Sequence, residues 1–454
     1  MSLSFHSVRL IEEECKGCTN CIKHCPTEAI RVYQGKARIR DELCIDCGEC
    51  IRHCPNHAKQ SFLDEINILN RFRYRIALLA PSFFGQFPQN SVEQIHAALK
   101  LSGFSSIAHV GRGAEYVSLA VHEYLKQHSR RPLISSACPT VVRLIQIRYE
   151  ELIENIVPIE SPMEIAATMA KEALRKKGYP DGDVGAVFIS PCPAKSSVVK
   201  QPFAREKSAV DGVLGMRQVY GLVLNALSKD AVRVGDELGM QASQLGMAWG
   251  SRGGELQKLP GMHLSVDGIY NVLNVLEELD MGRLNDVDFI EMQACPGGCV
   301  GGPLTVQNGF VAKAYLDTLC SQLPKAPSID YEEFMRQYRG HRFHWENPLQ
   351  PRSVLSMDED ISRALVLIQQ QEMIAEKLPG LDCGSCGSPT CQSLAEDIAR
   401  GLASENDCIF RLRESLQHLS EELWDLVKQV PPTLAKQEDE KTREPKEGSN
   451  DDHN

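Results

Sequence analysis

The sequence predicts a chain of three parts: a small α+β unit, a larger α/β domain with a parallel sheet, and a small helical unit. Three observations support this division. Tightly spaced cysteines fill residues 1–60, apolar segments alternate with amphipathic helices from residue 74 onward, and four more cysteines follow a long helical segment near the C-terminus. Alternating strands and helices are typical of a parallel sheet with helices on its faces. With 454 residues, the chain is long enough for several domains.

Composition and charge narrow the functional classes. The chain has 43% hydrophobic and 24% charged residues, which is ordinary for a globular protein. Its net charge of -11 argues against nonspecific binding to nucleic acid. No apolar run approaches the ~20 residues that a membrane span needs, and the N-terminus lacks the apolar core and cleavage site of a secretory signal. We therefore expect a cytoplasmic protein with no nucleic-acid partner and no membrane span.

Residues 1–60 contain two copies of the motif C-x2-C-x2-C-x3-C-P, ending at Pro26 and Pro55. This spacing is typical of bacterial ferredoxins, in which three cysteines of one copy and the last cysteine of the other bind each 4Fe-4S cluster. Two copies in register weigh against zinc sites or disulfides. The intervening residues 29–39 indicate a hairpin with Gly35 near its turn. The motif predicts a first cluster bound by Cys15, Cys18, Cys21 and Cys54, and a second bound by Cys44, Cys47, Cys50 and Cys25.

From residue 74, after a polar connector near residues 56–73, strands and helices alternate. The predicted strands cover residues 75–83, 105–110, 131–135 and 184–190, and the predicted helices cover residues 91–103, 114–128 and 163–178. Ser161, Pro162 and Glu164 form the pattern of a capping box with proline at the first helical position. Two of the strands run directly into loops that contain cysteine. Parallel sheets bind ligands past the carboxyl ends of their strands, so these loops are candidate ligand sites.

Three loops of this domain supply four further cysteines: Cys138, Cys192, Cys295 and Cys299. The loop at residues 288–303, DFIEMQACPGGCVGGP, is the most distinctive, because glycines such as Gly298 let the backbone approach a bulky inorganic group. Four thiolates complete one more 4Fe-4S cluster. Exposed iron-sulfur clusters are oxidised by air, so we expect an anaerobic organism. Only one of the 17 cysteines, Cys320, lies outside such groups, and we interpret it as a packing residue.

The loops SSACP at 135–139, PCPAK at 191–195 and EMQACPGGCVGG at 291–302 resemble the signature loops of the FeFe hydrogenase catalytic domain. The resemblance covers roughly residues 74–340, and we place this hydrogenase-like H-cluster domain at residues 74–345. It implies that Cys299 bridges the 4Fe-4S cluster to a diiron unit carrying carbon monoxide and cyanide, where hydrogen is made or split. It also implies that Lys195 donates to a cyanide ligand, as a cation that offsets an anionic, desolvated complex. Without the loop around it, this lysine would be interpreted as a solvated surface residue.

The chain departs from the family pattern where proton transfer is expected. Ala137 stands where efficient members have a proton-donating cysteine, and alanine cannot carry a proton. Val198 replaces an expected glutamate, while Ser190 and Gln293 replace methionines near the second and third loop ligands. General acid and base groups contribute factors of ~100 to 10000 in rate, so we expect slow turnover or another proton path. The residues predicted to contact the cofactor are Ser190, Gln293 and Gly298. The titratable residues interpreted as solvated helix positions are Glu115, His122 and Glu123.

Residues 355–430 form the predicted C-terminal unit, after a boundary at Pro348 and Pro351. Before it, residues 304–316 indicate a hairpin around Asn308 and Gly309, followed by a helix. The unit begins with a helix at 361–377, and its C-x2-C-x4-C-x16-C group resembles the four-cysteine cluster domain of electron-transfer subunits; zinc is the alternative. The helix at 409–430 is amphipathic and indicates core packing or a short coiled coil. Residues 431–454 are highly charged and predict a disordered tail. The predicted ligands of a fourth 4Fe-4S cluster are Cys383, Cys386, Cys391 and Cys408.

The combination of these parts resembles the sensory branch of the FeFe hydrogenases. Members of that branch usually continue into a PAS domain, which is not expected here, so a separate signalling partner would read the cluster state. The resemblance implies a slow hydrogenase, with hydrogen as substrate and with ferredoxin or another complex subunit as redox partner. Two rival hypotheses remain. The chain is either an electron-transfer subunit that never receives the diiron unit, or a hydrogenase-like iron-sulfur assembly factor.

Overall fold

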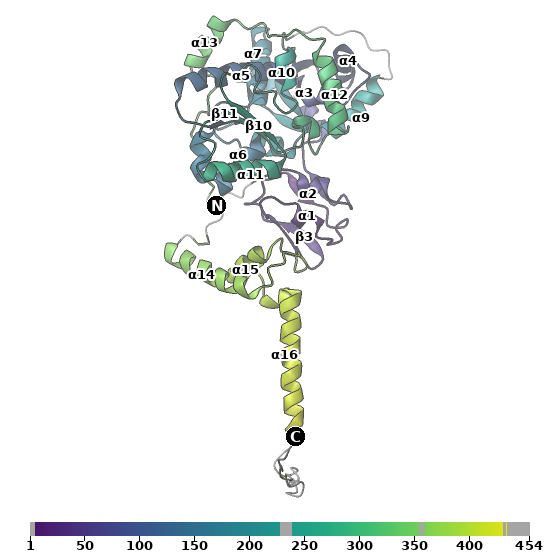
Figure 1. Ribbon diagram of the computed structural model, residues 1–454. Coiled ribbons are helices and arrows are strands. Elements are labelled where there is room, and N and C mark those ends of the chain that lie inside the picture. Colours follow the sequence, from purple (N-terminus) through teal and green to yellow (C-terminus); the bar gives the residue numbers. More distant parts are fainter. Residues whose placement is uncertain are drawn as a thin grey trace, which may run out of the picture.

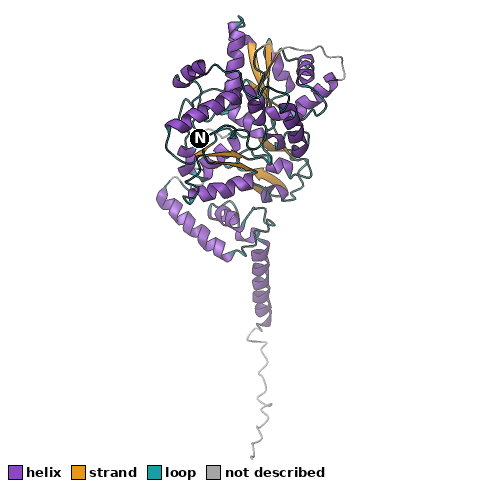
Figure 2. Cartoon of the chain, turned by 45° about the horizontal axis from the view of Figure 1, so that its top comes forward, coloured by secondary structure: helices purple, strands orange, loops and turns teal. Residues whose placement is uncertain are grey.

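The computed structural model describes residues 5–227, 238–352, 354, 357–358, 360–429 and 433. Figure 1 shows three bodies: a large α/β domain, a small N-terminal unit packed against it, and a C-terminal unit beyond, from which the last helix extends away. Figure 2 shows the strands gathered inside the helices of the large domain. This arrangement confirms the predicted fold class. None of the helices in the described residues is long and apolar enough to cross a membrane.

The N-terminal unit has the predicted ferredoxin-like form. Strands β2 (Ile30–Tyr33) and β3 (Lys36–Ile39) pair antiparallel around Gly35, which confirms the hairpin. Strands β1 (Val8–Leu10) and β4 (Lys59–Ser61) also pair antiparallel. The polar connector predicted near residues 56–73 was therefore partly wrong, since it contributes β4 and the 3-10 helix η1 (Ile66–Arg71). The short helices that carry cysteines are α1 (Asn20–Lys23) and α2 (Glu49–Arg52).

The α/β domain contains two parallel sheets. The first has the strand order β6-β5-β8-β9, and the second has the order β10-β11-β7. Every residue of β8 is buried, as a strand covered on both faces requires. The strands are β5 (Tyr74–Leu79), β6 (Ser106–His109), β7 (Leu133–Ile134), β8 (Val184–Ser190), β9 (Gly212–Gly215), β10 (His263–Asp267) and β11 (Phe289–Gln293). The predicted strand at 75–83 ends early, because Pro81 is at the first position of a short helix.

Helices cover both sheets, and most strands are followed along the chain by a helix. The helices of the first half are α3 (Pro81–Phe84), α4 (Val92–Leu101), α5 (Val110–Gln127), α6 (Pro139–Arg148), α7 (Pro162–Lys176) and α8 (Pro193–Lys200). Those of the second half are α9 (Met216–Leu227), α10 (Gln244–Ala248), α11 (Ile269–Asp280), α12 (Gly309–Cys320) and α13 (Tyr331–Arg339). The 3-10 helices are η2 (Glu150–Asn155), η3 (Asp181–Asp183) and η4 (Cys299–Gly301).

Two local predictions were wrong because a side chain makes a different hydrogen bond from the one expected. Ser161 is the N-cap of α7, but it makes no side-chain cap bond. The Glu164 carboxylate instead accepts hydrogen bonds from Arg205 Nη1 at 3.1 Å and from the backbone N–H of Ala209 at 2.7 Å. The hairpin predicted around Asn308 is also absent from the described chain. The Asn308 side chain accepts from the Phe310 N–H at 3.0 Å and caps α12.

The solvated positions predicted on α5 were wrong for both glutamates. Glu115 is 2% exposed and Glu123 is 6% exposed. Glu115 accepts from the Ser243 N–H at 2.6 Å and pairs with Arg112, while Glu123 pairs with Lys126 and accepts from the Tyr331 hydroxyl. Both carboxylates are therefore buried with partners, which is the usual condition for a buried charge.

The C-terminal unit docks on the N-terminal hairpin. The Val32 N–H donates to the Gly387 carbonyl at 2.8 Å, and Arg31 of β2 pairs with Asp397. The last helix extends from this unit with no buried residue, so core packing was the wrong interpretation of it. The elements of the unit are α14 (Ile361–Lys377), α15 (Cys391–Ala399), η5 (Glu405–Asp407) and α16 (Ile409–Lys428). The predicted disordered tail at 431–454 lies outside the described residues, apart from residue 433.

Candidate metal centre

The three cysteine loops of the α/β domain meet at one cavity. Cys138 follows β7 at the start of α6, and Cys192 follows β8 at the start of α8. Cys295 and Cys299 follow β11. All four line the same cavity. The parallel strands thus bring together at their carboxyl ends the four cysteines that are far apart in the sequence.

The pKa values of the Cys192 and Cys299 thiols are raised, so a bound positive group is needed to hold them as thiolates. Burial, and then the neighbouring Cys138 and Cys299, raise the pKa of Cys192 to about 12. Burial, and then Cys138, likewise raise the pKa of Cys299 to about 11, while Lys195 lowers it. None of the four forms a disulfide. Four partly buried thiols around one cavity fit a cationic metal group, because that group supplies the positive charge that four thiolates need.

Lys195 and Ala137 lie side by side at the same cavity. The Lys195 ammonium donates a hydrogen bond to the Ala137 carbonyl oxygen at 3.0 Å, so the lysine lies within the loop cluster and not on the solvated surface. Ala137 and Lys195 line the cavity with the cysteines. Val198 lines the adjoining cavity. The structure therefore places an apolar residue at each of these two predicted departures from the family pattern.

The three residues predicted to contact the cofactor differ in their positions relative to the cavity. Gln293 and Gly298 line the cavity, and the side-chain oxygen of Gln293 is buried without a hydrogen-bond partner. Gly298 has φ 93°, and an added Cβ would lie 2.8 Å from the Arg252 nitrogen, so only glycine fits there. Ser190 instead holds its own loop, since its hydroxyl donates to the Cys192 carbonyl and accepts from the Cys192 N–H.

Two buried acids near this cavity were missed by the sequence analysis. Glu255 lines the cavity, is 3% exposed, and accepts a hydrogen bond from the Ser135 hydroxyl at 2.5 Å. Burial, and then the charge of Glu291, raise the pKa of Glu255 to about 8. Burial raises the pKa of Glu291 to about 7, and its carboxylate accepts from the Ser265 hydroxyl at 3.2 Å. No motif marks Glu255, since it follows an ordinary glycine pair; only the fold brings it to the cavity.

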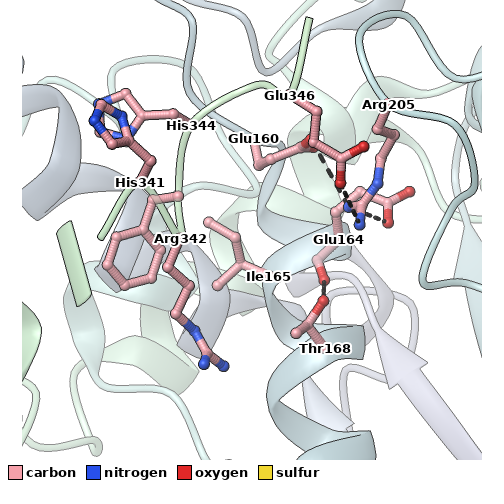
Figure 3. Close-up of a pocket in the computed structure, with 10 residues that line it drawn as sticks. Glu160, Glu164, Ile165, Thr168, Arg205, His341, Arg342, His344 and Glu346 are labelled. Atoms are coloured by element: carbon pink, nitrogen blue, oxygen red, sulfur yellow. Dashed lines mark hydrogen bonds and ion pairs between the residues drawn. The ribbon is translucent and has the colours of Figure 1, made fainter. Parts of the chain in front are cut away.

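A second cavity shares lining residues with this site and with a polar pocket. It shares Ala137 and Lys195 with the thiol cavity, and Glu160, Glu164 and Arg205 with the polar pocket. Figure 3 shows the next pocket, where Arg205 lies among three carboxylates. Arg205 is 3.7 Å from Glu160, 3.1 Å from Glu164 and 3.8 Å from Glu346. Burial raises the pKa of Glu160 to about 7, although Arg205 opposes the shift.

The ferredoxin-like cysteines gather into the two predicted groups. Burial, and then Cys15, Cys18 and Cys54, raise the pKa of Cys21 to about 11, while Lys59 lowers it. Burial, and then Cys25, Cys50 and Cys44, raise the pKa of Cys47 well above its usual value. In each group the structure therefore brings the last cysteine of one copy to the other copy. The role of these thiols as cluster ligands stays a prediction.

The C-terminal cysteines lie on one side of the N-terminal unit and the α/β cavity on the other. Burial, and then Cys408 and Cys383, raise the pKa of Cys386. An added Cβ at Gly384 would lie 3.2 Å from the Ile22 side chain of α1. On the opposite side, an added Cβ at Gly48 would lie 2.5 Å from Pro303. The ferredoxin-like groups thus lie between the C-terminal group and the α/β loops.

Comparison with known proteins identifies the family. The family model described as "Iron only hydrogenase large subunit, C-terminal domain" matches residues 73–259 and 255–303, which together are half of the chain. The chain belongs to the iron-only hydrogenase family. In this hydrogenase-family chain, a 4Fe-4S dicluster domain matches residues 7–55 and an Fe-S cluster family matches residues 378–410. It is therefore an iron-sulfur protein.

The relatives of this hydrogenase-family chain include catalysts and an assembly factor. It is 27% identical over 350 residues to iron hydrogenase 1 of Clostridium pasteurianum, covering 63% of this chain and 61% of that protein. It is 26% identical over 260 residues to "Probable cytosolic Fe-S cluster assembly factor oxy-4" of Caenorhabditis elegans, covering 46% of this chain and 54% of that protein. The chain thus spans less than two thirds of either relative. A structure of the FeFe-hydrogenase HydA1 from Chlamydomonas reinhardtii is 18% identical, with a TM-score of 0.49, and covers 62% of this chain and 95% of that one.

Proposed function

We propose that this protein slowly interconverts hydrogen with protons and electrons, and that it serves hydrogen sensing or ferredoxin-linked redox regulation. The observation that carries the proposal is the convergence of four cysteine thiols and Lys195 on one cavity. In this proposal, Cys138, Cys192, Cys295 and Cys299 hold a 4Fe-4S cluster. When bound, a diiron unit with carbon monoxide and cyanide ligands would supply the chemistry of hydrogen cleavage and formation at Cys299.

The protein's own residues set the charge and the proton supply at this cavity. Lys195 supplies positive charge beside the thiols, where a desolvated anionic group needs it. Gly298 keeps the backbone clear of side chains. Because Ala137 cannot donate a proton, the structure favours Glu255 as the acid. With a pKa of about 8, Glu255 holds a proton near neutral pH and can give it to the cavity.

Glu255 can recover its proton through Glu291. Glu291 lies close enough for its charge to act on Glu255, and the Ser265 hydroxyl reaches Glu291 from a half-buried strand. With a pKa of about 7, Glu291 exchanges protons readily at neutral pH. The pair therefore forms a short route of matched acids between the cavity and the edge of β10.

The remaining cysteine groups serve as an electron relay in this proposal. Two 4Fe-4S clusters in the ferredoxin-like unit and one in the C-terminal unit make four clusters in all. Their order, with the ferredoxin-like groups in the middle, suits electron exchange with a redox protein such as ferredoxin, or with a signalling partner that reads the cluster state.

A second candidate function has specific support, because one relative is an iron-sulfur assembly factor. In that case the chain would hold clusters and never carry the diiron unit. Infrared spectra of the purified protein, after exposure to the hydrogenase maturation enzymes, separate the two functions. Carbon monoxide and cyanide bands with two irons beyond the four clusters support the hydrogenase. Full cluster iron without these bands would overturn it in favour of an assembly or electron-transfer protein.

A further inference from the structure

Lys59 is a buried lysine whose charge the surrounding residues leave unmatched. It begins β4, where its backbone pairs with Leu10, and the residue is only 2% exposed. Its ammonium nitrogen has no hydrogen-bond partner among the described residues. A buried charge without a partner destabilises a protein interior, so such groups are normally paired. Its counter-charge must therefore come from something other than a neighbouring side chain.

The nearby carboxylates are committed to other partners. Asp46 accepts hydrogen bonds from Ser7 and Ser197 and pairs with Arg143 at 2.8 Å. Glu49 pairs with Arg52 and lies 3.3 Å from His53. Lys59 also lines the cleft between the ferredoxin-like unit and the α/β domain, and none of the described residues that line this cleft is acidic.

The negative charge that Lys59 does face belongs to the cysteines. Burial raises the pKa of Cys21, in the first predicted cluster group, and of Cys50, in the second, and the charge of the Lys59 ammonium group opposes both shifts. The two cysteines come from α1 and α2, and both pack in one buried cluster with Ala58, the residue next to Lys59 in the chain. One buried cation therefore acts on sulfur atoms of both groups at once.

We infer that Lys59 is the shared buried counter-charge of the two ferredoxin-like clusters and raises the reduction potential of both. Reduction adds an electron to a cluster, and a nearby cation stabilises the reduced form more than the oxidised form. The effect is large at this site because buried charges are poorly screened by solvent. The inference rests on the proposed assignment of the two cysteine groups as 4Fe-4S ligands. The C-x2-C-x2-C-x3-C-P motif ends before Lys59, so the motif alone gives no reason for a lysine there.

The test is a potentiometric titration of the full-length protein, followed by electron paramagnetic resonance of the reduced clusters. Lys59→Met keeps an unbranched side chain of similar length and removes the charge. We expect the equilibrium constant for reduction to fall about tenfold at both ferredoxin-like clusters, which is a shift of 59 mV to more negative potential. The matched control is Lys16→Met, an exposed lysine between Cys15 and Cys18, whose solvent-screened charge should change the constant much less.

Unchanged potentials in an iron-replete Lys59→Met protein would overturn the inference, as would an equal shift in the Lys16→Met control. If the methionine variant loses cluster iron, Lys59→Arg and Lys59→Gln decide the matter. If only Lys59→Arg retains cluster iron, the clusters require a positive charge at residue 59. If Lys59→Arg and Lys59→Gln lose iron equally, the inference is overturned. Failure of the cluster assignment itself gives a different result, because the native protein would then show no ferredoxin-type 4Fe-4S signals.

Discussion

At the scale of single residues, Ala137 gives the most direct test of the proton supply. Its side chain lines both the thiol cavity and the cavity beside it, so a thiol at this position would face the site. We expect Ala137→Cys to raise hydrogen evolution with an artificial reductant by about tenfold or more, since positioned acids contribute ~100 to 10000-fold in rate. The measurement is the evolution rate per diiron unit in fully matured protein. An unchanged or lower rate would contradict a limit set by proton supply at this position.

Glu255 is the second residue whose role can be measured. Glu255→Gln keeps an oxygen that can accept from Ser135 but removes the exchangeable proton. We expect both hydrogen evolution and hydrogen oxidation to fall by about 100-fold. The native carboxyl has a pKa of about 8, so it is protonated at lower pH and deprotonated at higher pH. Hydrogen evolution by the native protein should therefore decline as the pH rises through 8. The variant should lack this decline in its pH profile.

The control for Glu255 is another buried acid that lies outside the cavity. Glu123 on α5 is engaged by Lys126 and Tyr331, and its pKa lies below the usual value because these hydrogen bonds outweigh burial. Glu123→Gln should leave the rate and the pH profile as they are. Equal losses in the two variants would show a general effect of removing buried carboxylates and would remove the support for Glu255 as the proton donor.

The contrast between cysteines and acids shows what could be predicted at this scale. Cysteine spacing in residues 1–60 predicted which thiols would gather, because the doubled motif is typical of ferredoxins, in which the last cysteine of each copy joins the other copy. Glu255 could not be found in this way. Its closeness to Ser135 and Glu291 depends on how β7, β11 and the loop after α10 are packed, and no local pattern in the sequence encodes that arrangement.

At the scale of elements, the alternation of apolar and amphipathic segments predicted the strands β5 to β8 and the helices α4, α5 and α7 of the α/β domain. The errors arose where two local signals competed. Asn308 and Gly309 suit a hairpin turn, yet the same Asn308 side chain caps α12. The leucines of α16 follow a coiled-coil spacing, but they are exposed in the single chain; Leu412, for example, is 41% exposed. Periodicity predicts that a face is apolar and does not predict what covers it.

The contact between the C-terminal unit and the β2–β3 hairpin leads to a prediction at this scale. Gly387 lies against the Val32 carbonyl so closely that no Cβ fits. We expect Gly387→Val to release the C-terminal unit from the hairpin, seen as faster hydrogen exchange of the amides in β2 and as proteolysis between residues 340 and 380. Gly401→Val is the control, because Gly401 has a similar positive φ but nothing within 4 Å of its added Cβ. Equal effects from both variants would mean that backbone strain, and not lost docking, is responsible.

At the scale of the whole molecule, the order of the cysteine groups predicts a single path for electrons. The α/β loops contact the ferredoxin-like unit through Pro303, and the C-terminal loop contacts it through Ile22, so electrons from hydrogen should reach the C-terminal cluster only through the middle clusters. In Cys47→Ala, which removes a ligand of the second ferredoxin-like cluster, the C-terminal cluster should stay oxidised under hydrogen and yet be reduced by dithionite. Electron paramagnetic resonance of the matured protein measures the reduction of the C-terminal cluster under hydrogen and with dithionite. The matched control is Cys320→Ala, because Cys320 packs against the core of the α/β domain and belongs to none of the groups. Reduction of the C-terminal cluster by hydrogen at the native rate in Cys47→Ala would mean that electrons bypass the ferredoxin-like unit, and the three parts of the chain would then not form one relay.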